Sequence, residues 1–235
     1  MTNPCRRHFL RVTAAVAAAA VEGPAMTMEG ANVYELHLAK LQQDYLRLKQ
    51  VQSTEGKAEL KRQLLPEYIP YVDGVLTEGK GAQDQVLTIL MVWRMDAGDF
   101  TGALDIADYV ITHSLLMPDR FERTTGTIIA EEIAEAALKA QKAGGDFDLG
   151  LLLRTAQITG KEDMPDQARA KLHLAIGKAL SAQVADDAPT SNAMEPLELA
   201  KTHLARAIEL HTNCGGKKDL ERVERLLKKH TAAGS

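Results

Sequence analysis

Helical periodicity is the feature of this sequence that most limits how it can fold. Apolar residues recur at spacings of three and four along the body of the chain, and no stretch shows the sustained alternation of a half-buried strand. A chain with this pattern buries its apolar faces helix against helix. We therefore predict an all-α protein of antiparallel helical hairpins, with a long amphipathic helix near the N-terminus.

Prolines, glycines and short polar residues divide this pattern into separate helices. The long first segment opens at Val33, is broken near Ser53, and has a predicted buried stripe of Leu38, Leu41, Tyr45 and Leu48. The segment 84–97 is apolar nearly all round and is predicted to be a core helix. The other helices are expected near 71–76, from 103 towards the proline at 118, and at 127–143, 149–158, 165–181, 197–212 and 217–229, with a linker at 184–196.

Two stretches, 93–111 and 168–210, carry small residues where two helices can approach closely. The second resembles a tetratricopeptide hairpin, so the predicted fold is partly tetratricopeptide-like. The period is irregular, which favours a short stack of helix pairs over a full solenoid.

The two ends of the chain are basic and the middle is acidic, although the net charge is only −4. The segments 1–21 and 217–229 each have a net charge of +3, whereas 96–135 has a net charge of −7. This distribution is typical of a polyanion-binding protein with a separate protein-binding body, and chance variation in surface charge is the alternative. The candidate DNA-binding residues are Arg6, Arg7, Arg11, Lys217, Lys218, Arg222 and Arg225.

The N-terminal arginines also permit a different interpretation. Arg6-Arg7-His8-Phe9-Leu10, followed by an alanine-rich stretch, has the outline of a twin-arginine export signal. The same residues fit a short basic helix, because alanine is the best helix former. Elsewhere, no apolar run reaches the roughly 20 residues that a membrane span needs.

The sequence shows no recognisable active site. It lacks a phosphate-binding glycine loop, and His203 and His211, eight residues apart, have no third ligand nearby, so we expect them to be solvated. Two acid pairs, Asp105 with Asp108 and Glu131 with Glu135, each share a helix face and could hold Mg²⁺, although a solvated face is the commoner explanation. Neither pair comes with a nearby lysine or histidine suited to activating water or a leaving group. We therefore expect no cofactor and no metal, except Mg²⁺ if the chain itself cuts DNA.

The residues 64–125, which begin LLPEYIPYVDGVL and end MPDRFERTT, carry a specific resemblance. This string is similar to the small terminase subunit of temperate tailed phages of the P-two type, a family also labelled the terminase endonuclease subunit. The similarity extends to RRHFLRV and VYELHLAKL upstream and to DMPDQARAKLH and GGKKDLERVERLL downstream.

The resemblance implies a DNA-packaging role. Such a subunit recognises the cohesive-end site of concatemeric double-stranded phage DNA, partners a large subunit that carries the ATPase, and assembles with copies of itself, which we expect to form a ring. We accordingly expect a basic DNA-binding segment at 1–25, a helical core with oligomerisation at 32–160, and C-terminal helical hairpins at 161–235. The resemblance also favours the host cytoplasm over export and implies no membrane partner. The alternative function is a helical protein-interaction scaffold that does not bind DNA.

Overall fold

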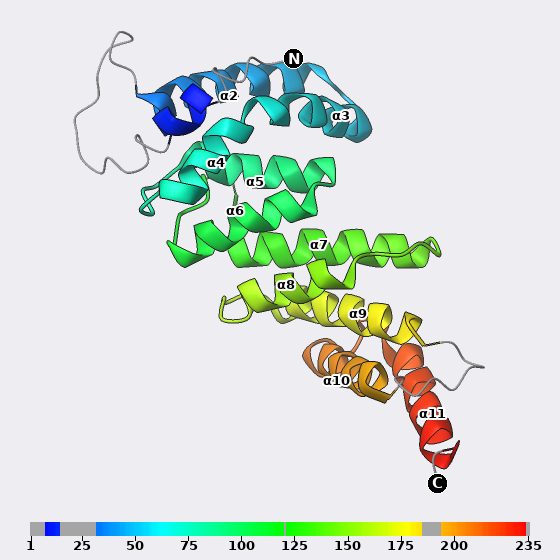
Figure 1. Ribbon diagram of the computed structural model, residues 1–235. Coiled ribbons are helices and arrows are strands. Elements are labelled where there is room, and N and C mark those ends of the chain that lie inside the picture. The colour runs from blue at the N-terminus through cyan, green and yellow to red at the C-terminus, as the bar shows by residue number, and fades with distance from the viewer. Residues whose placement is uncertain (1–7, 15–31, 120, 185–193, 234–235) are drawn as a thin grey trace. The chain divides into compact units, whose positions relative to one another are not determined.

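The computed structural model describes residues 8–14, 32–119, 121–184 and 194–233 (Figure 1). Every regular element in these ranges is a helix, which confirms the predicted all-α class. The chain divides into two compact units, residues 1–125 and 126–235. Packing alone defines these two units. The three segments expected from the sequence, 1–25, 32–160 and 161–235, were defined by their expected roles, and those roles stay a prediction.

The first unit is built around one buried helix. Residues 8–14 are helical, and the unit continues with α2 (Val33–Gln50), α3 (Thr54–Leu64), the short 3₁₀ helix η1 (Leu65–Glu67), α4 (Ile69–Glu78), α5 (Gln85–Ala97) and α6 (Phe100–Thr112). Helix α5 packs against α2, α3, η1 and α6, and its Leu87, Leu90 and Trp93 are buried. The prediction of a core helix over 84–97 is confirmed.

Local signals set the ends of these helices. Asp84 caps α5 by accepting a hydrogen bond from the backbone N–H of Leu87 at 2.9 Å. The helix ends at Gly98, whose φ of 83° lies in the left-handed region that glycine adopts without strain. Asp99 then caps α6 directly, so only two residues separate two antiparallel helices.

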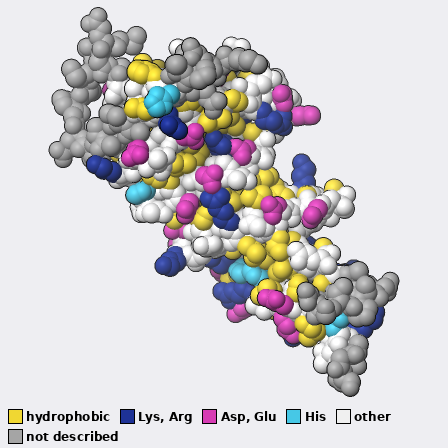
Figure 2. All heavy atoms as spheres, viewed as in Figure 1, with side chains coloured by type: hydrophobic (Ala, Val, Ile, Leu, Met, Phe, Trp, Pro, Cys, Tyr) yellow, Lys and Arg dark blue, Asp and Glu magenta, His cyan; other side chains and the backbone are white. Residues whose placement is uncertain are grey.

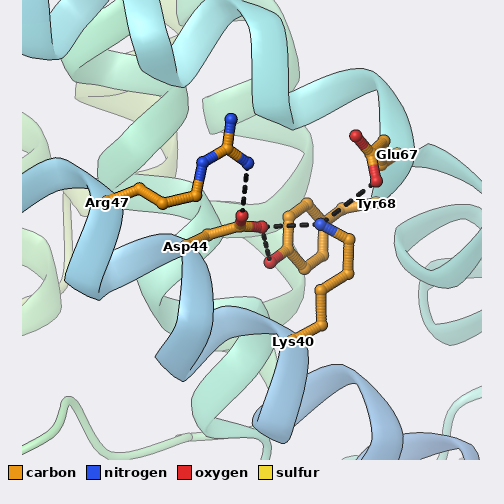
Figure 3. A network of polar contacts seen from close by, with 5 residues as sticks. All are labelled: Lys40, Asp44, Arg47, Glu67 and Tyr68. Carbon is orange, nitrogen blue, oxygen red and sulfur yellow. Dashed lines mark hydrogen bonds and ion pairs between the residues drawn. The ribbon is translucent and has the colours of Figure 1, made fainter.

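A network of polar contacts around one carboxylate attaches α2 to the rest of the first unit (Figure 3). Asp44, which is 4% exposed, accepts hydrogen bonds from Lys40 Nζ at 2.6 Å, Tyr68 Oη at 2.8 Å and Arg47 at 3.0 Å. Lys40 also pairs with Glu67 at 3.2 Å. Burial alone would raise the pKa of Asp44, but the hydrogen bonds from Lys40, Tyr68 and Arg47 lower it below its ordinary value.

This network corrects the stripe predicted for α2. Leu41 and Leu48 are buried as expected, but their partners in the buried face are His37 and Asp44, and Leu38 and Tyr45 are only half-buried. His37 stacks on Tyr71 with 4.3 Å between ring centroids, and Tyr71 donates a 2.5 Å hydrogen bond to Asp84. These polar residues can be buried because their polar atoms have partners: Asp44 has the network described above, and His37 Nδ1 lies 2.7 Å from the carbonyl oxygen of Val33.

The second unit contains α7 (Thr125–Lys142), which begins at the boundary, α8 (Leu149–Thr159), α9 (Asp166–Ala182), α10 (Met194–Leu210) and α11 (Lys217–Ala233). Helices α9 and α10 form an antiparallel pair: His173 faces His203, while Gly177 faces Ala200 and Leu204. A Cβ on Gly177 would lie 2.6 Å from Leu204 Cγ, so glycine permits this close approach. The predicted hairpin architecture is confirmed, and its tetratricopeptide character stays a prediction.

We predict that Asp44→Asn lowers the free energy of unfolding by about 2–4 kcal/mol, because the change breaks a buried ion pair and a hydrogen-bond network. Urea or thermal unfolding measures the effect. The matched control is Asp108→Asn on the exposed side of α6, which should change stability by less than about 0.5 kcal/mol. Equal effects of the two changes would show that Asp44 is not a structural anchor.

Candidate nucleic-acid interface

Helix α11 separates apolar and basic side chains on opposite faces. Val223, Leu226 and Leu227 are buried against the rest of the second unit. Four basic residues recur at i, i+4, i+7 and i+11, a spacing that places them along one helix face. We name this face the basic stripe; its members are Lys218, Arg222, Arg225 and Lys229. Of the acids of α11, Glu221 lies three residues after Lys218 and four before Arg225, so it borders this face.

One member of the basic stripe has a structural role. Arg222 is half-buried and donates hydrogen bonds to the carbonyl oxygens of Ser181 and Val184, both at 3.2 Å. These carbonyls lie at the end of α9 and just beyond it, where a helix leaves most of its carbonyl oxygens without an intrahelical donor. A second contact joins Lys178 of α9 to Asp219 of α11 at 2.8 Å. Together they fix the orientation of α11, with Lys218, Arg225 and Lys229 exposed.

The structure thus divides the candidate residues of the C-terminal segment. Lys217, Lys218 and Arg225 are exposed, as a phosphate-binding role requires, whereas Arg222 is held by α9. Lys229 was not among the candidates chosen from the sequence, although its distance of four residues from Arg225 signals a shared face. Lys228 is also exposed beside it.

The N-terminal candidates are only partly within the described residues. Arg11 lies in the helical stretch 8–14 and is exposed, with Phe9 and Val12 also exposed on either side of it. Arg6 and Arg7 fall outside the described residues.

The two acid pairs have different surroundings. Asp105 and Asp108 are exposed on α6. Lys171 of α9 pairs with Glu135 at 2.5 Å and lies 3.7 Å from Glu131, so an ammonium group bridges the two carboxylates of α7. Sequence spacing does not reveal this lysine, because it lies 36 residues from Glu135. Across the described ranges, no three metal-ligating side chains gather where they could hold an ion.

His203 also has an unexpected partner. Its Nδ1 lies 2.9 Å from Nδ1 of His173 on α9, so it is not simply solvated on its own helix. Among the described helices, none is long and apolar enough to cross a membrane.

These observations define an all-helical protein with an exposed basic helix. Its sequence matches the phage small terminase subunit family over residues 38–167. It is 43% identical over 228 residues to the protein named "Terminase, endonuclease subunit" of Escherichia phage P2, covering 97% of this chain and 87% of that protein. It is 27% identical over 194 residues to the "Probable terminase, endonuclease subunit" of Haemophilus phage HP1, covering 81% of this chain and 69% of that protein. No solved structure matches. The chain belongs to the phage small terminase subunit family.

We predict that Arg222→Gln destabilises the second unit by about 2 kcal/mol, because it removes two hydrogen bonds from a charged donor. Thermal unfolding checks this. Lys218→Gln, an exposed change on the same helix face, should alter stability by no more than about 0.5 kcal/mol. A thermal midpoint unaffected by Arg222→Gln would mean that Arg222 does not hold α11 on α9.

Proposed function

We propose that this chain is the DNA-recognition subunit of a packaging terminase. It binds the cohesive-end site of concatemeric double-stranded phage DNA in the host cytoplasm. It assembles with copies of itself, as a ring, and with a large subunit that supplies ATP hydrolysis. Membership of the small terminase subunit family supports the packaging role.

The observation that carries the DNA-binding part of the proposal is the basic stripe of α11. Lys218 and Lys229 are 11 residues apart, which corresponds to about 16 Å along a helix. A row of cations of this length can contact several successive phosphates, and each contact releases condensed counterions. Arg6, Arg7 and Arg11 provide a second basic group at the other end of the chain, in a stretch without acids.

We propose that DNA cleavage takes place in the complex with the large subunit, although both relatives are named as endonuclease subunits. The chemistry of the acid pairs supports this division. Lys171 already pairs with Glu131 and Glu135. Asp105 and Asp108 lie within the most acidic part of the chain, which repels a phosphate backbone.

The DNA-binding proposal predicts a specific dependence on salt. Lys218, Arg225 and Lys229 changed together to Gln should weaken binding to cohesive-end DNA and reduce the slope of log affinity against log salt by about 2–3. Arg6, Arg7 and Arg11 changed together to Ala should have a similar effect. Gel shifts at several salt concentrations measure both slopes, and Lys80→Gln, a basic residue outside both groups, is the control.

An unchanged slope in either variant would remove that segment from the DNA interface. If the unaltered chain fails to shift DNA even at low salt, the helical protein-interaction scaffold becomes the better description.

The cleavage proposal predicts that the isolated chain binds DNA with Mg²⁺ present but does not cut it. Nicking should appear only when the large subunit is added, because that subunit provides the catalytic carboxylates. A supercoiled plasmid carrying the cohesive-end site detects single nicks. Mg²⁺-dependent nicking by the isolated chain, lost in Asp105→Asn or Glu131→Gln, would place the active site in this subunit.

A further inference from the structure

Two histidines and two arginines meet where α9 packs on α10. His173 and Arg169 are four residues apart on α9, and His203 and Arg206 are three apart on α10, so each pair shares a helix face. The two imidazoles touch, with 2.9 Å between their Nδ1 atoms and 5.0 Å between ring centroids. We name these four residues the His–Arg seam. Figure 2 shows histidine and basic side chains together on this part of the surface.

The seam reaches solvent. Arg206 is exposed, and Arg169, His173 and His203 are half-buried. Arg169 donates a 2.6 Å hydrogen bond to the carbonyl oxygen of Glu162, a contact that orients the guanidinium without neutralising its charge. Arg206 pairs with Glu209 at 2.7 Å, and both side chains of this pair are largely exposed, so solvent screens it.

The neighbouring helices bring their acids to other positions of α9. Glu131 and Glu135 of α7 pair with Lys171, and Asp219 of α11 pairs with Lys178. Helix α8, which also packs on α9, has Arg154 as its one charged residue. The seam therefore concentrates positive charge between the two helices.

This environment keeps the histidines neutral in the free protein. Burial, together with the nearby His203, Arg206 and Arg169, lowers the pKa of His173 to about 4. Burial also lowers the pKa of His203. A bound anion would raise the pKa of both histidines, because negative charge near the imidazoles favours their protonated form.

The contact between the rings allows one proton to be added without breaking it. In the neutral pair one His donates from Nδ1 and lacks a proton on Nε2, while the other accepts at Nδ1 and carries its proton on Nε2. A proton added to the vacant Nε2 leaves the Nδ1–H···Nδ1 hydrogen bond in place. The pair then has a charge of +1 and two Nε2–H donors.

We propose that the His–Arg seam binds a phosphate of the DNA backbone and that the histidine pair takes up one proton as it does so. This inference rests on the proposed DNA-binding function and adds to it a second contact surface, separate from the basic stripe. Because binding and protonation favour each other, DNA affinity should increase as the pH falls from about 8 to about 6.

The test measures DNA affinity of the full chain near pH 8 and near pH 6. The unaltered chain should bind about three- to tenfold more tightly near pH 6, since uptake of one proton gives at most tenfold per pH unit. His173→Asn with His203→Asn should abolish this gain and leave affinity near pH 8 almost unchanged. His211→Asn, at the end of α10 and outside the seam, is the matched control and should keep the gain.

A second variant covers the case in which the double histidine change unfolds the hairpin. Arg206→Gln leaves the histidine pair intact at an exposed position and should reduce the salt slope by about one. Either of two results would overturn the seam as a phosphate-binding site: an unchanged pH dependence in a folded double histidine variant, or an unchanged salt slope in Arg206→Gln. Neither result would bear on DNA binding by the basic stripe. Failure of the unaltered chain to bind DNA at either pH would instead contradict the proposed function itself.

Imidazole titrations followed by NMR identify the ligand. Adding the cohesive-end duplex should raise the pKa of His173 and His203. An equal rise with inorganic phosphate alone would indicate a site for free phosphate and overturn the assignment to DNA. No rise with either ligand would overturn the site.

Discussion

The buried carboxylate of Asp44 is the interaction on which the first unit most depends. Apolar contact between helices is non-directional, so by itself it leaves a helix free to rotate or slide on its neighbours. Asp44 removes that freedom, because Lys40, Tyr68 and Arg47 converge on its two oxygens. A rotation of α2 that buried Leu38 and Tyr45 instead would bring this carboxylate towards solvent and leave Tyr68, which is 1% exposed, without its partner.

In the second unit, too, specific side-chain contacts determine how the helices align along one another. Gly177 allows α9 and α10 to approach closely, and the His173–His203 contact marks one position along their length. Arg222 then fixes α11 by occupying the last carbonyls of α9. Lys218, Arg225 and Lys229 stay exposed on α11, while Asp219 and Arg222 of the same helix contact α9 and the residues that follow it. Contacts that stabilise the fold thus also determine which charges remain on the surface.

Much of the fold follows from local sequence signals, whereas the polar contacts do not. Ser53, Gly98 with Asp99, and Gly215 with Gly216 mark helix ends that the structure places within a few residues of their predicted positions. The stripe of α2 was wrong in part because periodicity treats Asp44 as a solvated residue until Tyr68, 24 residues away, is seen beside it. The pairing of His173 with His203, 30 residues apart, likewise leaves no spacing to detect. Charge clustering did reveal the candidates on α11, but it could not separate Arg222, which holds the helix, from its exposed neighbours.

The distribution of acids gives a reason for DNA to approach particular surfaces of this chain. Residues 96–135 have a net charge of −7, and the exposed carboxylates of Asp105 and Asp108 belong to this stretch. Under the proposed function, a phosphate backbone would be repelled there and attracted to the basic ends, so the field would orient the encounter before any contact forms. Several acids close to the proposed binding surfaces are paired: Asp219 with Lys178, Glu131 and Glu135 with Lys171, and Glu209 with Arg206. Pairing these acids with basic side chains lowers the repulsion that a phosphate backbone would meet there.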